Sequence, residues 1–266
     1  MTGKLIAPAL LSSVMAAALL LFSPTGAAAF HEATIHLEAG GWFPSLDAKA
    51  RSSSFGLSGD LISNDEIGLE DPDVVIIGSA TLRFAQRHTL RAEAFGFSVD
   101  GSKRINQSFT FDGKIYPIGT QVDSEADVLF GGADYGFDLV HNEIVAIGLT
   151  LGVRVVSAKA TVEAPQLNQK GEGELQAALP ALGIVGILHP FPVPILKSLA
   201  LSARLAGGTI GDAGTFIDVD GGIEWLPIPV LALRIGYRYF HAEGENDGDE
   251  AEVDLSGPYA SVTLTF

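Results

Sequence analysis

The chain has 266 residues, a net charge of −16 and no cysteine, and its composition is 47% hydrophobic against 18% charged. So acidic a protein is a poor nucleic-acid binder, which needs clustered lysine and arginine, and it can form neither a disulfide nor a thiolate metal site. Beyond the N-terminal segment, no apolar run reaches the roughly 20 residues that a membrane helix needs. Strands that turn every second side chain toward lipid would account for the hydrophobicity.

The first 29 residues are typical of a secretory signal. Lys4 precedes an apolar stretch from Leu5 to Phe22, Pro24 follows it, and Ala27–Ala29 offers a cleavage site of the A-x-A type. We therefore expect one mature domain, residues 30–266, with a net charge of −17, because cleavage removes Lys4 and no acid. An uncleaved membrane anchor is the alternative, which the proline and the alanine triplet disfavour.

Alternation of apolar and polar side chains marks the strands, most clearly between residues 230 and 240. Ile235 and Tyr237 fall on one face there, and Arg234 and Arg238 on the other. A period of two with aromatic rings toward one end is what a lipid-facing strand needs. Similar patterns predict ten strands: Thr34–Phe43, Val74–Phe84, Thr89–Ser98, Asp127–Leu139, Glu143–Val156, Ala177–Leu188, Ser198–Gly207, Thr215–Leu226, Val230–Phe240 and Tyr259–Phe266.

The segments between these strands alternate in length. Short turns are expected at 86–88, 140–142 and 227–229, with a proline-rich one at 189–197. Long polar loops are expected at 44–73, 99–126, 159–176, 208–214 and 241–258. Short turns at one rim and long loops at the other are the arrangement of an outer-membrane barrel. The segment Ala177–Leu188 is apolar on both faces, so its orientation stays open.

The end of the chain carries a family resemblance. Its last strand, from Tyr259 to the terminal Phe266, resembles the C-terminal signature of bacterial outer-membrane barrels, which the barrel-assembly machinery reads in that family. With the signal segment and the loop alternation, the mature chain resembles small barrels of the OmpA/OmpX type. The resemblance implies insertion by that machinery and contact with outer-membrane lipid and lipopolysaccharide.

A narrower resemblance concerns the middle of the chain. Arg87–His88, Phe111–Gly113, Tyr116–Thr120 and Ser124–Asp127 look like a pattern that recurs among proteobacterial outer-membrane barrels without an assigned activity. This likeness implies a location and a fold, and no functional residue is carried over from it.

The predicted fold is therefore all-β, a closed antiparallel up-and-down barrel in the bacterial outer membrane. About ten strands are expected, with roughly eight to twelve compatible with the pattern. The barrel must close because an open sheet edge in lipid would leave backbone groups without hydrogen bonds.

Charges of both signs nearly balance on the face assigned to the lumen, and every base there is arginine. The planar guanidinium can serve two carboxylates at once, which suits a confined polar interior. These residues predict an ion-pair network that fills a narrow barrel; the alternative is the charged lining of a passive channel. The set comprises Glu38, Arg83, Arg91, Glu93, Asp134, Asp138, Arg154, Arg204, Asp218, Asp220, Glu224, Arg234 and Arg238.

The expected loop from Glu243 to Asp254 holds seven acids and no base. A solvated loop is the simplest interpretation, and a weak Ca²⁺ or Mg²⁺ site is the alternative, although the spacing does not fit an EF-hand. His241, Glu243 and Glu245 follow the aromatic end of one strand, where some ten-stranded barrel proteases place a histidine and aspartates.

We expect no catalytic, cofactor or metal residues, because the sequence contains no Gly-x-Ser-x-Gly elbow or H-E-x-x-H motif. The expected function is a non-enzymatic role in envelope integrity or surface interaction. A narrow channel is the second hypothesis, and an enzyme with an extracellular-rim site is the third.

Overall fold

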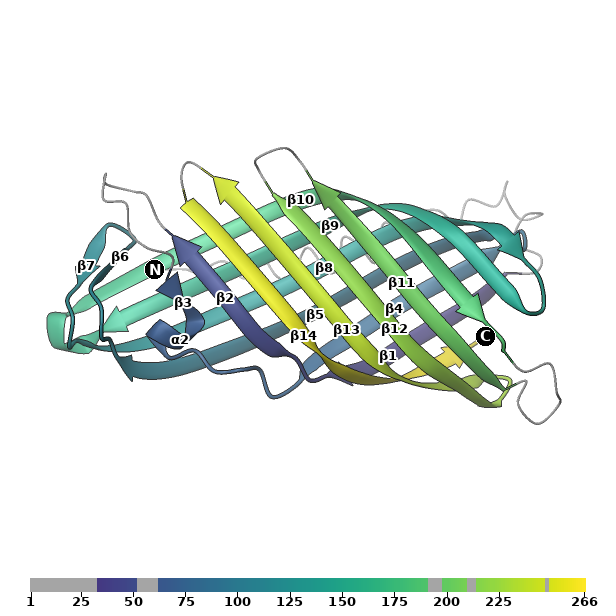
Figure 1. Ribbon diagram of the computed structural model, residues 1–266, viewed down its shortest axis with the longest axis horizontal. Helices are drawn as coiled ribbons and strands as arrows, with labels where there is room; N and C mark the ends of the chain where they lie inside the picture. Colours follow the sequence, from purple (N-terminus) through teal and green to yellow (C-terminus); the bar gives the residue numbers. More distant parts are fainter. Residues whose placement is uncertain (1–32, 52–61, 191–197, 210–213, 247–248) are drawn as a thin grey trace.

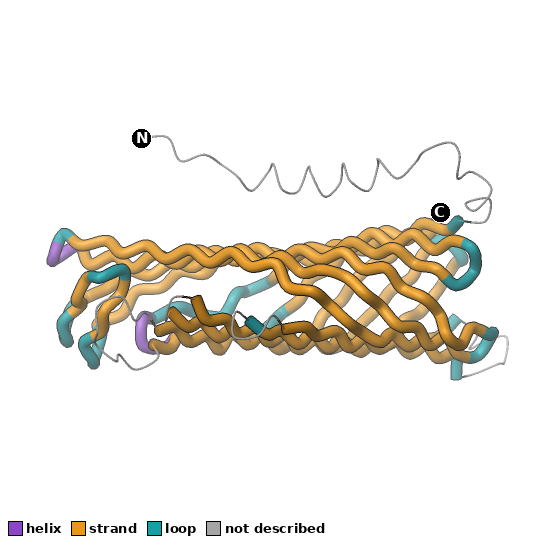
Figure 2. The backbone as a smooth tube through the Cα atoms, turned by 90° about the horizontal axis from the view of Figure 1, so that it is seen from above, coloured by secondary structure: helices purple, strands orange, loops and turns teal. Residues whose placement is uncertain are grey.

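The computed structural model describes residues 33–51, 62–190, 198–209, 214–246 and 249–266, so the expected signal segment lies outside the described residues. Long antiparallel strands run along the molecule, and the short helical segments lie toward one end (Figures 1 and 2). In the described part, no helix is both long and apolar enough to cross a membrane. The elements are β1 (Thr34–Trp42), β2 (Ser45–Arg51), β3 (Ile62–Ser63), α2 (Asn64–Ile67), β4 (Val75–Phe84), β5 (His88–Arg104), β6 (Phe109–Phe111), β7 (Lys114–Tyr116), β8 (Gln121–His141), β9 (Val145–Ala164), the 3₁₀ turn η2 (Pro165–Leu167), β10 (Gln169–Leu188), β11 (Leu199–Thr209), β12 (Thr215–Ile228), β13 (Leu231–Asn246) and β14 (Asp249–Thr265).

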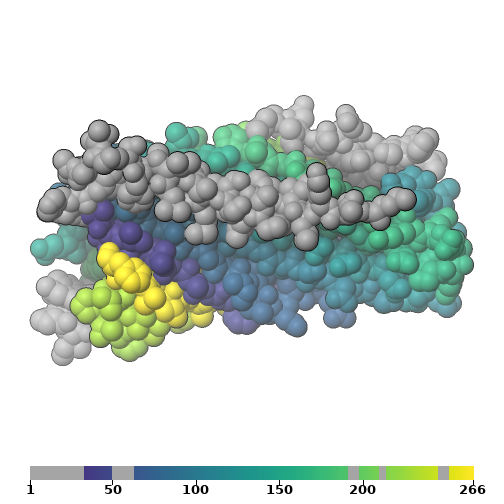
Figure 3. Space-filling model, turned by 180° about the vertical axis from the view of Figure 1, so that it is seen from behind, coloured from purple at the N-terminus to yellow at the C-terminus, as the bar shows by residue number. Residues whose placement is uncertain are grey.

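The sheet closes on itself. Each long strand pairs antiparallel with the next, and β1 pairs with β14, with Leu37 opposite Leu264. The first and last strands accordingly lie side by side in the space-filling view (Figure 3). β2 continues the same seam along the outer half of β14. The predicted fold is confirmed: β1, β4, β5 and β8 to β14 form a closed ten-strand antiparallel barrel.

Membrane-level strands have apolar outer faces and inward polar groups. On β13, Ile235 is 64% exposed, whereas Ala232 and Arg238 are each 5% exposed. The orientation left open for 177–188 is settled in the same way, since Leu182 points outward and Leu179 is buried. Aromatic side chains flank this belt, as expected at the two membrane interfaces: Phe43, Tyr237 and Tyr239 toward the extracellular end, and Phe84, His88, Tyr135, Phe137 and Trp225 toward the other.

The prediction of long loops is wrong for much of the extracellular end. β5, β8, β9 and β10 continue as paired strands through the expected loops at 99–126 and 159–176, and β13 and β14 through 241–258. The segment 44–73 contains β2, β3 and α2. Above the membrane the outer face meets water, so the strands continue without the apolar alternation that marks them in lipid.

The tall extracellular sheet is packed on its inner face by the hairpin of β6 and β7 (Figure 1). Tyr116 is fully buried and donates a hydrogen bond to the carbonyl of Val162 at 3.0 Å. The hairpin turns at Asp112–Gly113, whose φ values of 51° and 65° suit an Asp-Gly turn. The outer face of this sheet is acidic: Asp123, Glu125, Asp127 and Glu163 are exposed there.

Candidate functional site

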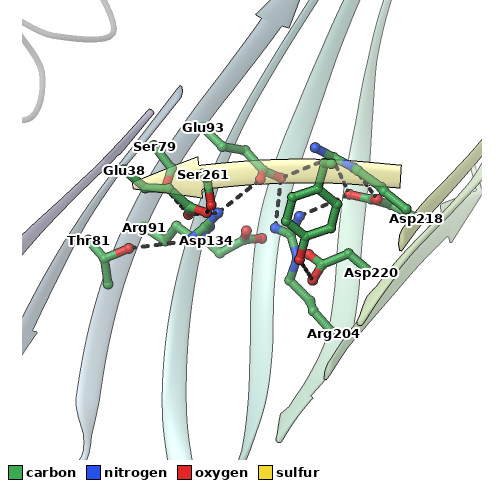
Figure 4. Close-up of polar contacts among 12 residues, drawn as sticks. Glu38, Ser79, Thr81, Arg91, Glu93, Asp134, Arg204, Asp218, Asp220 and Ser261 are labelled. Carbon is green, nitrogen blue, oxygen red and sulfur yellow. Dashed lines mark hydrogen bonds and ion pairs between the residues drawn. The ribbon is translucent and has the colours of Figure 1, made fainter. Parts of the chain in front are cut away.

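A layer of arginines and carboxylates crosses the lumen at membrane level (Figure 4). Arg204 of β11 lies at its centre, because its guanidinium meets three carboxylates from two other strands. Its nitrogens lie 2.8 Å from Glu93 Oε1, 3.3 Å from Asp218 Oδ2 and 3.2 Å from Asp220 Oδ2. One arginine thus ties β5 and β12 to β11 across the barrel.

Two arginines of the layer make bidentate pairs, the strongest geometry for this kind of contact. Arg154 donates to both oxygens of Asp134, at 2.7 and 2.9 Å, and is only 1% exposed. Arg238 donates to both oxygens of Asp218, at 2.9 and 2.8 Å. Both pairs join cross-strand positions inside the barrel, on β8 and β9 and on β12 and β13.

Glu38 anchors the periplasmic side of the layer. It accepts hydrogen bonds from the hydroxyls of Ser79 at 3.1 Å and Ser261 at 2.7 Å, and Arg91 lies 3.4 Å away. Arg234 completes this side through its pair with Asp220. The hydroxyls let a carboxylate be held by neutral donors as well as by arginine.

The structure therefore brings most of the predicted inward residues into one network, with three outside it. Arg83 and Asp138 pair separately, at 3.3 Å, nearer the periplasmic rim, where His141 also contacts Asp138. Glu224 makes no ion pair with any described residue. It lies opposite Arg234 in the register of β12 and β13, but that arginine turns to Asp220.

Little space remains within the layer. A gap of about 20 Å³ lies among Glu38, Arg91, Arg204, Asp220 and neighbouring residues. A cavity needs roughly 10–15 Å³ of such space to hold one water molecule. The gap therefore has room for about one water.

An apolar layer lies directly above the charged one, on its extracellular side. Phe95 stacks on Phe130 with ring centroids 4.5 Å apart, and Phe240 packs against both rings edge-on. Arg238 joins the two layers, with its guanidinium carbon 4.9 Å from the centroid of Phe95. Buried neighbours complete the layer: Trp42, Val75, Leu179, Phe216, Leu255 and Tyr259.

Our sequence reasoning missed this second layer, although its signal was present. The aromatic residues lie on the same inward face as the charged residues, two residues further toward the extracellular end of each strand. Phe95 follows Glu93 by two residues, Phe240 follows Arg238 by two, and Phe216 precedes Asp218 by two. A period of two carried past the last charge would have placed these rings in the lumen.

The residues considered for an extracellular-rim enzyme lie elsewhere. His241 is on the outer face of β13, in phase with Tyr239, whereas Phe240 and Ala242 point into the barrel. Glu243 is exposed on the same outer face, and the side chain of Glu245 lies outside the described residues. Neither His241 nor Glu243 overlooks the lumen.

This fold, with its apolar belt and aromatic flanks, defines an integral outer-membrane β-barrel of bacteria. Among solved structures, the fold is similar to that of the outer-membrane protease OmpT of Escherichia coli, with a TM-score of 0.60 and 9% identity over 88% of this chain and 97% of that one. The NalP translocator domain of Neisseria meningitidis (TM-score 0.41, 10% identity, 96% and 98% covered) and Ail of Yersinia pestis (0.40, 10%, 88% and 99%) are more distant. No protein-family model or curated sequence matches the chain.

Proposed function

We propose that this protein is a closed, non-conducting and non-enzymatic barrel with a structural or surface-interaction role in the outer membrane. The observation that carries the proposal is the pair of layers across the lumen. The charged layer uses its arginines and carboxylates on one another, and the apolar layer above it contains packed rings. Lining charges in a conducting pore would face water.

The energetics of the two layers support a permanent closure. An ion crossing the barrel would have to separate buried pairs such as Arg154 with Asp134, which leaves charges without partners away from water. It would then meet stacked rings that offer it no hydration. The gap in the charged layer has room for about one water, which is too little for a hydrated ion.

The part offered to the surroundings is the tall extracellular sheet. β5, β8, β9 and β10 extend above the apolar belt, and the β6–β7 hairpin already covers part of their inner face. The polar outer face is then the available contact surface, facing lipopolysaccharide and the medium. We include insertion by the barrel-assembly machinery in the proposal, because β14 ends in the alternating strand expected of its clients.

Conductance in planar bilayers tests the proposal directly. Refolded protein should show no steady single-channel steps. A variant in which Glu93, Phe95, Phe130 and Arg204 are all replaced by serine opens both layers and should conduct, which shows that silence of the wild type is not a failure to detect channels.

Circular dichroism and protease protection establish that both proteins are folded and inserted. A matched variant with four serines on the outer face of the extracellular sheet, at Asp123, Glu125, Asp127 and Glu163, should remain silent. Steady conductance of the wild-type protein would overturn the closed barrel and establish the channel. If the fourfold lumen variant does not fold, a known porin refolded into the same bilayers serves as the positive control, and the wild-type result still decides between the two.

A further inference from the structure

The outer face of β13 and β14 carries a histidine among carboxylates just above the apolar belt. The two strands remain paired there, with His241 opposite Asp254 and Glu243 opposite Glu252. All four point away from the lumen, because the alternate residues Phe240, Ala242, Val253 and Leu255 belong to the apolar core. The backbone register therefore holds these side chains together on one surface.

The distances suit a shared ion. His241, Glu252 and Asp254 can each offer one ligand atom, and these atoms lie within 4.8 Å of one another. His241 Nδ1 and Asp254 Oδ1 are 3.0 Å apart. Two atoms bound to one tetrahedral zinc, about 2.0–2.1 Å from the metal, lie roughly 3.3 Å apart. The histidine and Asp254 are thus near ligand spacing, and the longer Glu252 can close the remaining distance by rotation.

The surroundings favour a cation. Glu243 lies 3.9 Å from His241 Nε2, and Tyr239 donates a hydrogen bond to Asp254 at 2.7 Å, which orients that carboxylate. Among the described side chains, Lys49 is a base beside this group, 3.7 Å from Glu252. The side chains of His241, Glu252 and Asp254 are between 17% and 31% exposed, so they are partly shielded yet open to an ion from the medium.

The donor set selects the class of ion. Calcium takes six to eight oxygen ligands and magnesium an octahedron of oxygens, whereas an imidazole with two carboxylates suits borderline divalent metals such as zinc. We propose that His241, Glu252 and Asp254 bind a divalent metal ion of the zinc class on the outer face of the β13–β14 hairpin. Three protein ligands leave one coordination position open, and the bound ion joins the two strands.

This inference does not depend on whether the lumen conducts. It predicts zinc binding to the refolded wild-type protein, measured by titration calorimetry, and a rise in unfolding temperature with zinc, since the ion binds the folded hairpin. Cobalt in place of zinc should give the absorption bands of a tetrahedral site. Calcium and magnesium should produce neither binding heat nor stabilisation at the same concentrations.

Variants separate ligands from nearby charge. Loss of outer-shell partners alone lowers metal affinity by roughly 10–100-fold, so His241→Asn should weaken zinc binding by at least about tenfold and remove the cobalt bands. Glu252→Gln and Asp254→Asn should do the same. Glu174→Gln removes an equal charge from an exposed position on β10 and should leave zinc binding unchanged.

The site would be overturned by a lack of zinc binding to the folded wild type, or by equal binding to wild type and His241→Asn. Equal losses in Glu174→Gln and Glu252→Gln would also overturn it, since general attraction by an acidic surface would then explain the binding. If one variant folds poorly, the comparison of zinc, cobalt, calcium and magnesium on the wild-type protein still tests the site.

Discussion

Strand β8 crosses two regions of the molecule with opposite patterns. In the membrane, Tyr135 and Leu139 are exposed on its outer face, and Asp134 is buried in the lumen. Above the membrane, the outer face carries exposed Asp123, while the inward Val122 is fully buried. Within the membrane, this strand therefore has apolar side chains outside and polar ones inside. Above the membrane it has the opposite pattern, which is that of a water-soluble sheet.

The difference shows that the solvent on the outer face decides the pattern on both faces. The backbone pairing of β8 continues from one region into the other, and its one irregularity lies near the periplasmic end, between Asp138 and Val140. In lipid the outer side chains must be apolar, and polar groups move inward, where they need partners. In water the hydrophobic effect again favours apolar side chains inside. The charged layer and the apolar layer of the lumen meet at the level where the surroundings of the outer face change from lipid to water.

The largest expected effect is the loss of a buried arginine from the charged layer. Arg154→Ala leaves Asp134 without its bidentate partner in a position hidden from water. Such a change costs about 3–5 kcal/mol. The midpoint of urea unfolding, measured by tryptophan fluorescence in lipid vesicles, should fall accordingly.

The control for Arg154→Ala is the loss of an ion pair in the extracellular region. Lys114 lies only 2.6 Å from Asp112, but the two side chains are 38% and 44% exposed. The hydrogen bond from Lys114 holds the pKa of Asp112 below its ordinary value, yet a solvated pair contributes little to folding. Lys114→Ala should not move the urea midpoint. Similar losses in both variants would contradict the distinction between the two regions.

A second prediction places the same charge on the outer face of β9 in each region. Leu151 is 59% exposed in the apolar belt, so Leu151→Arg puts a cation into hydrocarbon at a cost of about 2–4 kcal/mol near the midplane. Thr161→Arg lies on the same face above the belt, beside Glu125 and Glu163, and should be neutral or slightly stabilising. Urea unfolding in vesicles measures both, and equal costs would show that the belt does not end between these residues.

The sequence allowed the barrel to be predicted because lipid enforces a readable pattern. β9 covers the expected strand from 143 to 156 except its first two residues, and β13 covers the expected strand from 230 to 240 except its first residue. The pattern could not predict where these strands end outside the membrane. Residues such as Lys159 and Glu163 face water there, so their positions on the outer face need not be apolar. Pairing with neighbouring strands extends β9 to Ala164, and such tertiary contacts cannot be read from one segment alone.

The candidate site divides in a similar way. Alternation was enough to assign Arg154, Arg204 and Asp218 to the lumen, and the structure brings them there. Alternation could not predict which arginine pairs with which carboxylate, because the pairing depends on how the side chains extend across the lumen. Arg234 passes over its cross-strand neighbour Glu224 and pairs with Asp220 instead.

The smallest expected effect comes from an arginine pair at the periplasmic rim, which separates burial from pairing. Arg83 contacts Asp138 at 3.3 Å, but its side chain is 29% exposed, against 1% for Arg154. Asp138 itself is buried, but the loss of a partly exposed arginine admits water to it, so Arg83→Ala should cost clearly less than Arg154→Ala, at about 1 kcal/mol. Asp138 is also left with a contact to His141 at 3.1 Å. The urea midpoint of Arg83→Ala, compared with that of Arg154→Ala under the same conditions, provides the measurement. If the two variants lose equal stability, pairing rather than exclusion of water stabilises the lumen, and the charged layer would then be no more closed than the rim.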